Sequence, residues 1–327
     1  MILTITLNPC IDHTMVVHGI TLHDRNPVLR TEIDAGGKGV NLSRIVGILG
    51  GETVATGFIG GKAGLFVKQV IDDQGVVSDF VQIAGETRTN ISVESGDGPP
   101  TVFGSPGPTV TEADWHQLLG KVGQHACQGS WVCLGGSTPP GLPENAASQL
   151  FELAKKAGAR VLLDADGQAL ERGLQSAPDM VKPNRHEAQR LLKRAITTVG
   201  EAVDAAQTIL EVLVSHGAAQ PIGVVSLGDK GAVVATLEKT VYALPPKVDV
   251  LSTIGSGDSF NGAFLDSLIS GRSLEDCLRM GVAAGAATAV SDGAHIGCLE
   301  DIERFALETV VVDFESSPEL QRRQLDD

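Results

Sequence analysis

The chain has 327 residues, of which 42% are hydrophobic and 39 are glycine, and its formal net charge is −15. This length and apolar share predict one large α/β domain with its own core, or such a domain with a small appendage. Because no block of Lys and Arg offsets the acidic charge, a nucleic-acid partner is not expected.

The chain opens on a strand-like run, Ile2–Leu7, without a basic segment before it, and it has no apolar stretch long enough to span a bilayer. We therefore expect neither a signal peptide nor a membrane span. The cysteines form no CxxC pair, which favours reduced thiols and a cytoplasmic location. Cys10 and His13 lack neighbours that would complete a metal site.

Short apolar runs alternate with amphipathic segments along the whole chain. The apolar runs predict strands at 2–7, 53–59, 130–134, 161–164, 180–182 and 222–226. The amphipathic segments predict helices at 41–49, 64–74, 144–157, 185–192 and 199–216. This alternation predicts a mostly parallel sheet covered by helices on both faces.

Two segments, 13–33 and 82–102, are rich in β-formers and have no helical period. They could form a small extra sheet that acts as a lid, or they could be ordinary surface loops, and the pattern alone favours neither. Residues 232–237 and 240–244 predict a hairpin. The acidic composition at the end of the chain predicts a loose tail over 311–327, after a main domain over 1–310.

The run Gly255-Ser256-Gly257-Asp258 leads directly into a helical pattern. Free N–H groups at a helix start, joined to a glycine turn, form a nest for an anion. Such an Asp could simply cap the helix. The arrangement also suits phosphoryl transfer, in which the amides stabilise the moving group and the carboxylate accepts a hydroxyl proton.

A second glycine run, Gly36-Gly37-Lys38-Gly39, also leads into a helical pattern, and Asn41 follows it. Its amides could close on a polar ligand, or the run could be a tight turn with a solvated lysine. It is not a Walker A loop, and no GxGxxG follows a strand, so a dinucleotide-binding fold is not expected. Asp12 lies just beyond the first strand, where ligands of open α/β sheets bind, although Asp is common in such turns.

Further strand ends carry small or polar residues. Ser137 follows one strand, and Asn184 and Glu187 follow another. Their spacing puts Asn184 and Glu187 on one side of a helix's first turn, where they could hold waters of a magnesium ion or form a capping box. A later strand and turn carries Ser226, Gly228 and Gly231. Together these strand ends predict one cleft along the carboxyl edge of a single sheet.

In this order, the motifs resemble those of the PfkB-type carbohydrate kinases over essentially residues 1–300. The matching elements are Thr6-Leu7-Asn8-Pro9 with Asp12, Gly36-Gly37-Lys38-Gly39 with Asn41, Gly85–Asn90, Gly136–Gly141, Lys182-Pro183-Asn184 with Glu187, Ser226-Leu227-Gly228 and Gly255-Ser256-Gly257-Asp258. The resemblance implies a ribokinase-like fold, which is a three-layer α/β/α domain with a mostly parallel sheet and a small β-sheet lid. In relatives the lid often pairs between two subunits, so the resemblance also implies a homodimer.

The resemblance implies a role for each motif. Asp258 would deprotonate the acceptor hydroxyl, and the moving phosphoryl group would be stabilised by amides of Gly255, Ser256 and Gly257. The sugar hydroxyls would be held by Asp12, Gly37, Lys38 and Asn41. The phosphate that the sugar already carries would be bound by Arg88 and Ser137. The nucleotide site would be lined by Lys182, Asn184, Ser226, Gly228 and Gly231, and the magnesium of Mg-ATP would be held through water by Asn184 and Glu187.

Within the family, the opening motif and Thr87-Arg88-Thr89-Asn90 resemble the phosphosugar branch. The implied activity is ATP-dependent phosphorylation of a ketohexose monophosphate, with fructose 1-phosphate first and tagatose 6-phosphate or fructose 6-phosphate as alternatives. An inactive sensor of sugar phosphates or nucleotides is a remote alternative. The branch commonly has Asn-Arg where this chain has Asn26-Pro27, so a second phosphate-binding cation is not assured, and the unusual sequence of 290–297 leaves dependence on a monovalent cation open.

Overall fold

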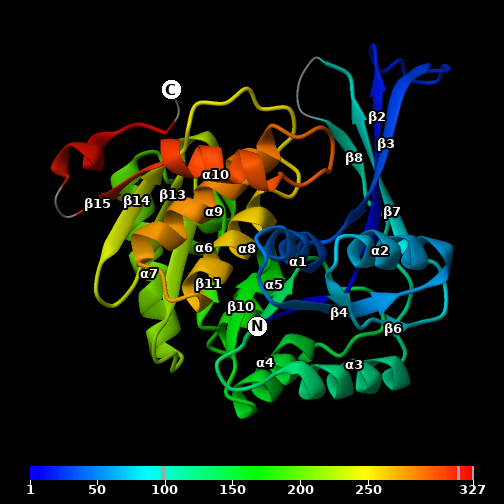
Figure 1. The fold of residues 1–327 in the computed structure, drawn as a ribbon, viewed down its shortest axis with the longest axis horizontal. Helices are drawn as coiled ribbons and strands as arrows, with labels where there is room; N and C mark the ends of the chain where they lie inside the picture. Colours follow the sequence, from blue (N-terminus) through cyan, green and yellow to red (C-terminus); the bar gives the residue numbers. More distant parts are fainter. Residues whose placement is uncertain (97–99, 315–316, 326–327) are drawn as a thin grey trace.

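The structure, a computed structural model, describes residues 1–96, 100–314 and 317–325. An 11-stranded sheet forms its centre, and a four-stranded second sheet stands at one end (Figure 1). The central strands lie in the order β15-β14-β13-β12-β11-β10-β9-β1-β4-β5, and β6 pairs with β4. Their bounds are β1 Ile2–Thr6, β4 Thr53–Ile59, β5 Val77–Ser78, β6 Val81–Gln82, β9 Trp131–Gly135, β10 Arg160–Asp164, β11 Met180–Val181, β12 Ile222–Ser226, β13 Ala232–Ala235, β14 Thr240–Leu244 and β15 Val310–Asp313.

The strands from β5 to β12 run parallel, as predicted, and β13 to β15 are antiparallel. β13 and β14 form the predicted hairpin. The central strands are apolar throughout because both faces are buried. In β9, Trp131 and Cys133 belong to one hydrophobic cluster, and Val132 and Leu134 belong to the cluster on the other side. This is the alternation that a strand covered on both faces requires.

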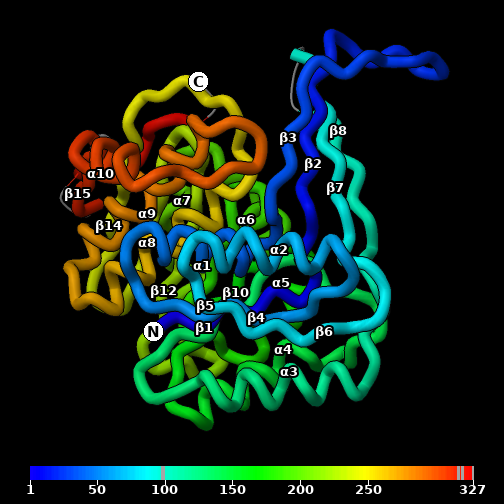
Figure 2. Tube along the Cα trace, turned by 45° about the vertical axis from the view of Figure 1, so that its right-hand side comes forward, coloured from blue at the N-terminus to red at the C-terminus, as the bar shows by residue number. Residues whose placement is uncertain are grey.

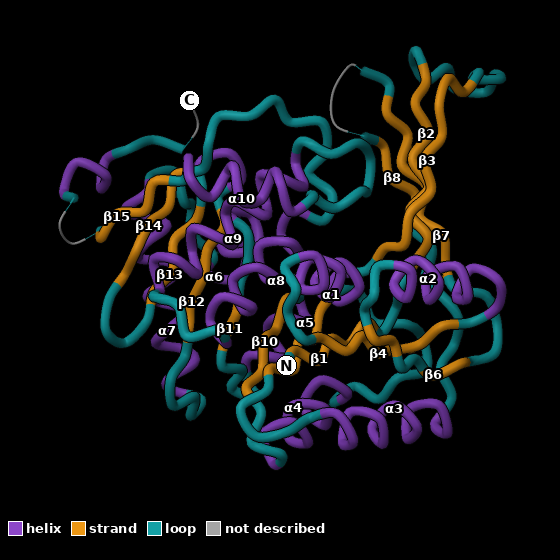
Figure 3. The backbone as a smooth tube through the Cα atoms, in the orientation of Figure 1, coloured by secondary structure: helices purple, strands orange, loops and turns teal. Residues whose placement is uncertain are grey.

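Helices cover the two faces of the central sheet (Figure 3). One face is covered by α1 Lys38–Ile48, α8 Ser256–Ile269 and α9 Leu274–Ala289, with α10 Leu299–Glu308 packed on α9. The other face is covered by α3 Glu112–His125, α4 Ala146–Lys156, α5 Gly167–Leu174, α6 Arg185–Leu192 and α7 Val199–Ser215. The predicted helices are confirmed with small shifts at their ends. No helix in the described ranges is long and apolar enough to cross a membrane.

The second sheet contains β2 Cys10–Val17, β3 Val28–Gly36, β7 Arg88–Glu94 and β8 Thr101–Phe103, in the order β3-β2-β7-β8. It rises from the body of the molecule, and α2 Gly61–Asp73 packs near its base (Figure 2). The segments 13–33 and 82–102 thus form a sheet rather than surface loops, although 97–99 lie outside the described residues. β2 follows β1 after a short turn and β3 leads into α1, so the second sheet joins the domain beside the carboxyl ends of the central strands.

The end of the chain differs from the loose tail that its composition predicts. β15 pairs with β14, so the expected boundary at residue 310 falls inside a strand of the central sheet. After a short 3-10 helix, Pro318–Arg322, the Leu325 amide donates to the Thr197 carbonyl at 2.8 Å. Leu320 and Leu325 are buried in the main core. A few apolar residues therefore dock this acidic segment, although 315–316 and 326–327 lie outside the described residues.

Candidate active site

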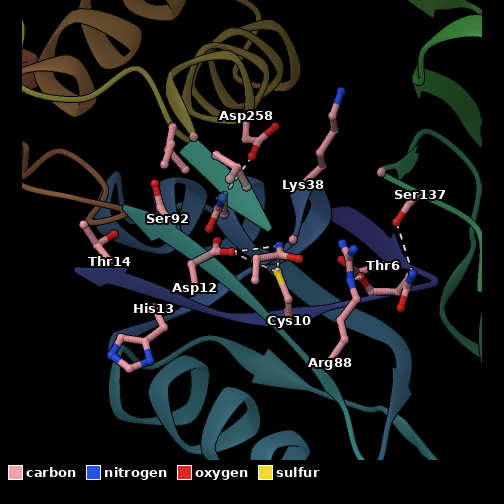
Figure 4. Close-up of a pocket in the computed structure, with 18 residues that line it drawn as sticks. Thr6, Cys10, Asp12, His13, Thr14, Lys38, Arg88, Ser92, Ser137 and Asp258 are labelled. Carbon is pink, nitrogen blue, oxygen red and sulfur yellow. Dashed lines mark hydrogen bonds between the residues drawn. The ribbon is translucent and has the colours of Figure 1, made fainter. Parts of the chain in front are cut away.

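A cavity of about 380 Å³ lies between the second sheet and the carboxyl ends of the central strands (Figure 4). All the residues that the motifs assign to sugar binding line it, together with two from the anion nest: Asp12, Gly37, Lys38, Asn41, Arg88, Ser137, Gly255 and Asp258. Figure 4 shows Asp258 and Lys38 on one side and Asp12 and Arg88 on the other. The cavity is therefore shared between the two sheets, as expected of one cleft at the strand ends.

The Asp258 side chain does not cap its helix. Gly255 occupies the N-cap position of α8 with φ +77°, a left-handed conformation that favours glycine, and no side chain caps this helix start. The carboxylate instead faces the cavity, where Oδ2 accepts a hydrogen bond from Asn41 Nδ2 at 2.9 Å. Asp258 is thus a carboxylate beside a helix N-terminus, where the first amides have no partner within the helix.

Asp258 has the proton affinity of a general base. Burial and the negative charge of Asp164 raise its pKa to about 7, against the opposing effects of Lys38, the Asn41 hydrogen bond and Lys182. A carboxylate in this range can accept a hydroxyl proton near neutral pH, because an efficient catalytic base has a pKa close to the working pH.

Asp164, which the motifs did not single out, ends β10 directly beneath this site. Its carboxylate accepts hydrogen bonds from Lys38 Nζ and from Asn261 Nδ2, and Lys182 Nζ lies 3.6 Å from its Oδ2. Burial opposes the charged form, but Lys182 and Lys38 hold the pKa of Asp164 below its usual value. Its position at the end of a predicted strand, like that of Asp12 beyond the first strand, was the sequence signal that could have identified it.

Arg88 and Ser137 lie on either side of Asn8. Arg88 Nε donates to the Asn8 carbonyl at 3.2 Å, and its Nη1 donates to the Ser105 carbonyl at 3.0 Å. Asn8 Nδ2 donates to Ser137 Oγ at 3.1 Å. These contacts place a guanidinium and a hydroxyl against one wall of the cavity, which suits an anionic group such as a phosphate.

The rest of the wall presents further polar atoms. Asp12 Oδ1 accepts hydrogen bonds from Asn90 Nδ2 at 3.0 Å and from Cys10 Sγ at 3.2 Å. Several buried oxygens of the lining side chains have no hydrogen-bond partner within the described part of the chain: Thr6 Oγ1, Asn8 Oδ1, Asn41 Oδ1, Asn90 Oδ1 and Ser92 Oγ. Since buried polar atoms are normally hydrogen-bonded, this lining fits a ligand with several hydroxyl groups.

The residues expected to bind the nucleotide do not line the sugar cavity, and they gather at the ends of β11 and β12. Asn184 forms an isolated parallel bridge with Ser226, and the 3-10 turn Gly228–Lys230 follows, with Gly231 at φ +96°. Lys182, buried beside Asp164, connects this group to the centre of the site.

Asn184 and Glu187 form the capping box that was the alternative to a magnesium role. The Glu187 amide donates to Asn184 Oδ1 at 2.9 Å, and the Asn184 amide donates to Glu187 Oε2 at 2.8 Å. Burial opposes the charged form of Lys38, but the negative charges of Asp164 and Asp258, with a smaller contribution from Glu187, raise the pKa of Lys38. Within the described ranges no three acidic, His or Cys side chains could chelate a metal directly, and an oxygen pair at a helix start suits an ion that keeps its waters.

Comparisons with known proteins agree with this geometry. The model of the "pfkB family carbohydrate kinase" matches residues 5–302. The chain is 33% identical to the 1-phosphofructokinase of Bacillus subtilis over 314 residues, which is 95% of this chain and 99% of that one. It is also 33% identical to the 1-phosphofructokinase of Escherichia coli over 288 residues, which is 88% of this chain and 90% of that one.

Solved structures share the fold. Phosphofructokinase-2 from Escherichia coli in complex with substrates and products has a TM-score of 0.86 and 31% identity, over 94% of this chain and 98% of that one. Ribokinase from Arabidopsis thaliana, at 23% identity and a TM-score of 0.74, shows the fold alone, over 93% of this chain and 98% of that one. The fold is ribokinase-like, as expected, and pfkB kinases transfer phosphate from ATP with a divalent metal. The chain therefore belongs to the pfkB family of carbohydrate kinases and is an ATP-dependent phosphotransferase.

Proposed function

We propose that this kinase phosphorylates a ketohexose monophosphate, and that the substrate is fructose 1-phosphate, which becomes fructose 1,6-bisphosphate. The observation that carries the proposal is a cavity with Asp258 on one side and the Arg88–Ser137 pair on another. A neutral sugar would not need a guanidinium, whereas a phosphosugar does. The names of the Bacillus subtilis and Escherichia coli relatives support fructose 1-phosphate.

Fructose 6-phosphate is the second candidate, because a similar solved structure is phosphofructokinase-2 from Escherichia coli in complex with fructose-6-phosphate. Tagatose 6-phosphate remains the third. Each of these three sugar phosphates has one free primary hydroxyl, at the end of the molecule opposite to its phosphate. The pocket chemistry fits each of them.

In the proposed reaction, Arg88 and Ser137 hold the existing phosphate, and Asp12 and Asn41 bind sugar hydroxyls. Asp258 accepts the proton of the free primary hydroxyl. The hydroxyl oxygen forms a bond to the γ-phosphorus of ATP, and the bond between that phosphorus and the ADP oxygen breaks. The amides at the start of α8 stabilise the transferred group. Magnesium, held through water by Asn184 and Glu187, would neutralise charge on the ATP phosphates.

The variant Asp258→Asn tests this proposal. An amide cannot accept the proton, so kcat should fall by about 10²–10⁴-fold while KM for the sugar phosphate changes little. The measurement is a coupled ADP-release assay with fructose 1-phosphate, tagatose 6-phosphate, fructose 6-phosphate, fructose and ribose. Asp266→Asn is the matched control, since Asp266 is on the same helix but not among the residues that line the cavity. Full turnover of Asp258→Asn would refute the proposed base.

We also propose that two chains pair through their second sheets. His13 is in register with Ile33 on β3 and Ile91 on β7, and Ile91 is in register with Phe103 on β8. Residues in register share a face, and this row lies on the opposite face to Asp12. Ile33 and Phe103 are 51% and 59% exposed, an apolar surface that a partner sheet could cover. Light scattering should give a dimer, and Ile33→Lys with Phe103→Lys should give a monomer.

A further inference from the structure

Asp164 is a buried carboxylate that has no assigned role in the proposed phosphoryl transfer. It is the last residue of β10, which lies between β9 and β11 in the middle of the central sheet. The residue is only 4% exposed. Taking a carboxylate out of water costs several kcal/mol unless cations and hydrogen bonds compensate it, so the partners of Asp164 explain why it is tolerated.

Those partners come from elements that also carry the catalytic groups. Lys38 is the first residue of α1, the helix that carries Asn41, and its ammonium group donates to Asp164 Oδ1. Asn261 lies one helical turn after Asp258 on α8, and its Nδ2 donates to Asp164 Oδ2 at 2.6 Å. One carboxylate thus fixes both the helix that orients the base and the helix that carries it.

Asp258 stands inside this group of charges. The charged and titratable groups that face it are Asp164 on β10, Lys38 on α1, Lys182 after β11 and Cys10 on β2. A small cavity of about 10 Å³ is lined by Lys38, Asp164, Asp258 and Asn261, which is room for about one water molecule. Because Asp164 is buried and this cavity is small, its charge acts on Lys38 and Asp258 with less screening than charges at the protein surface.

We propose that Asp164 is a positioning residue of phosphoryl transfer. It holds the Lys38 ammonium group beside Asp258, so that both groups are correctly placed for the sugar hydroxyl. The proposal rests on the proposed role of Asp258 as the base. Lys38 lines the main cavity as well as pairing with Asp164. Asp164 therefore acts on the substrate through Lys38 without touching it.

The first test is Asp164→Asn, measured as kcat against pH. An amide holds an ammonium group weakly, so Lys38 should lose its fixed position and kcat should fall by about 10–100-fold, with a smaller change in KM. Removing the Asp164 charge lowers the pKa of Asp258, whereas the loss of Lys38 from its fixed position raises it. Because the effect of Asp164 is the larger of the two, the acidic limb of the kcat profile should move to lower pH. An unchanged kcat and an unchanged limb would overturn the proposal.

The matched control is Asp34→Asn. Asp34 is also a buried carboxylate, 6% exposed, and accepts a hydrogen bond from the Arg44 guanidinium at 3.0 Å, but it does not line the cavity. Both variants remove one partner of a buried ion pair, so both should melt at a lower temperature. Only Asp164→Asn should shift the acidic limb. An equal shift in Asp34→Asn would mean that the effect is merely structural and would overturn the proposal.

Lys38→Met supplies a second variant if Asp164→Asn does not fold. Removing a cation near Asp258 should move the acidic limb to higher pH, opposite to the change in Asp164→Asn. An unmoved limb would overturn the proposal. In the double variant of Asp164→Asn with Lys38→Met, kcat should be no lower than in the less active of the two single variants, because both changes break the contact between Asp164 and Lys38. Losses that multiply would show that Asp164 does not act through Lys38.

The experiment separates this proposal from the one on which it rests. If Asp258→Asn keeps full turnover, the base assignment fails and the pH profiles must be assigned to another group. If Asp258→Asn is inactive while Asp164→Asn keeps the profile of the unchanged chain, the base assignment stands and the role of Asp164 alone is refuted.

Discussion

Replacing Arg88 by Ala should convert a phosphosugar kinase into one that scarcely distinguishes phosphorylated from free sugar. Two N–H groups of Arg88 bond the Asn8 and Ser105 carbonyls, which orients the guanidinium on the cavity wall. A hydrogen bond between charged groups contributes about 1.5–3 kcal/mol. For this half-buried side chain we take a total of about 2–3 kcal/mol, which corresponds to about 30–150-fold in kcat/KM.

The assay compares kcat/KM for fructose 1-phosphate and for fructose. Arg88→Ala should lose the full factor on fructose 1-phosphate, mainly through KM, and less than about threefold on fructose, which has no phosphate to bind. Arg88→Lys keeps the charge but lacks the planar fork, so its loss should be intermediate. An equal loss on both sugars would refute the assignment of Arg88 to the substrate phosphate.

Two further changes test other parts of the molecule. Glu187→Gln should raise the magnesium concentration that gives half-maximal rate by about tenfold. Glu201→Gln disturbs an equivalent capping box on α7 and should leave that concentration unchanged. The same magnesium dependence in both variants would contradict the metal role of Glu187. Leu320→Ala should lower the free energy of unfolding by about 2–3 kcal/mol in denaturant titrations, because Leu320 is buried in the main core, and should leave kcat unchanged. A loss well under 1 kcal/mol would show that the end of the chain does not support the fold.

The strand and helix pattern was predictable from sequence because the central strands are apolar on both faces and the helices are amphipathic. The second sheet was harder. The segments 13–33 and 82–102 are rich in β-formers but are broken by Gly and Pro, so their pattern favours neither a small sheet nor surface loops, and the pairing of β2 with β3 and β7 decides between them. β15 was missed because a short apolar run, Val310–Val312, sits next to an acidic segment whose average composition suggests disorder.

The site was predictable where glycine and a reactive side chain occur together, as at Asp258 and Lys38. Asp164 was not, because its role depends on three partners that are distant in sequence: Lys38, Lys182 and Asn261. Its position at a strand end marks Asp164 as a candidate, but nothing local in the sequence shows these partners. Whether Asp258 caps its helix or faces the cavity could not be decided from the local sequence either, since the deciding contact is with Asn41 on another helix.

Within the described residues, four connections join the second sheet to the domain: the β1–β2 turn, the junction of β3 with α1, the β6–β7 connection and the segment from β8 to α3. Asp12 and Arg88 stand on this sheet, whereas Asp258 is on α8, which packs on the central sheet. A sugar phosphate bound as proposed would contact the second sheet and α8 at the same time, whereas a water molecule is too small to reach both. In the proposed reaction the full geometry requires an occupant long enough to span both, so we expect ATP hydrolysis in the absence of a sugar phosphate to be slow.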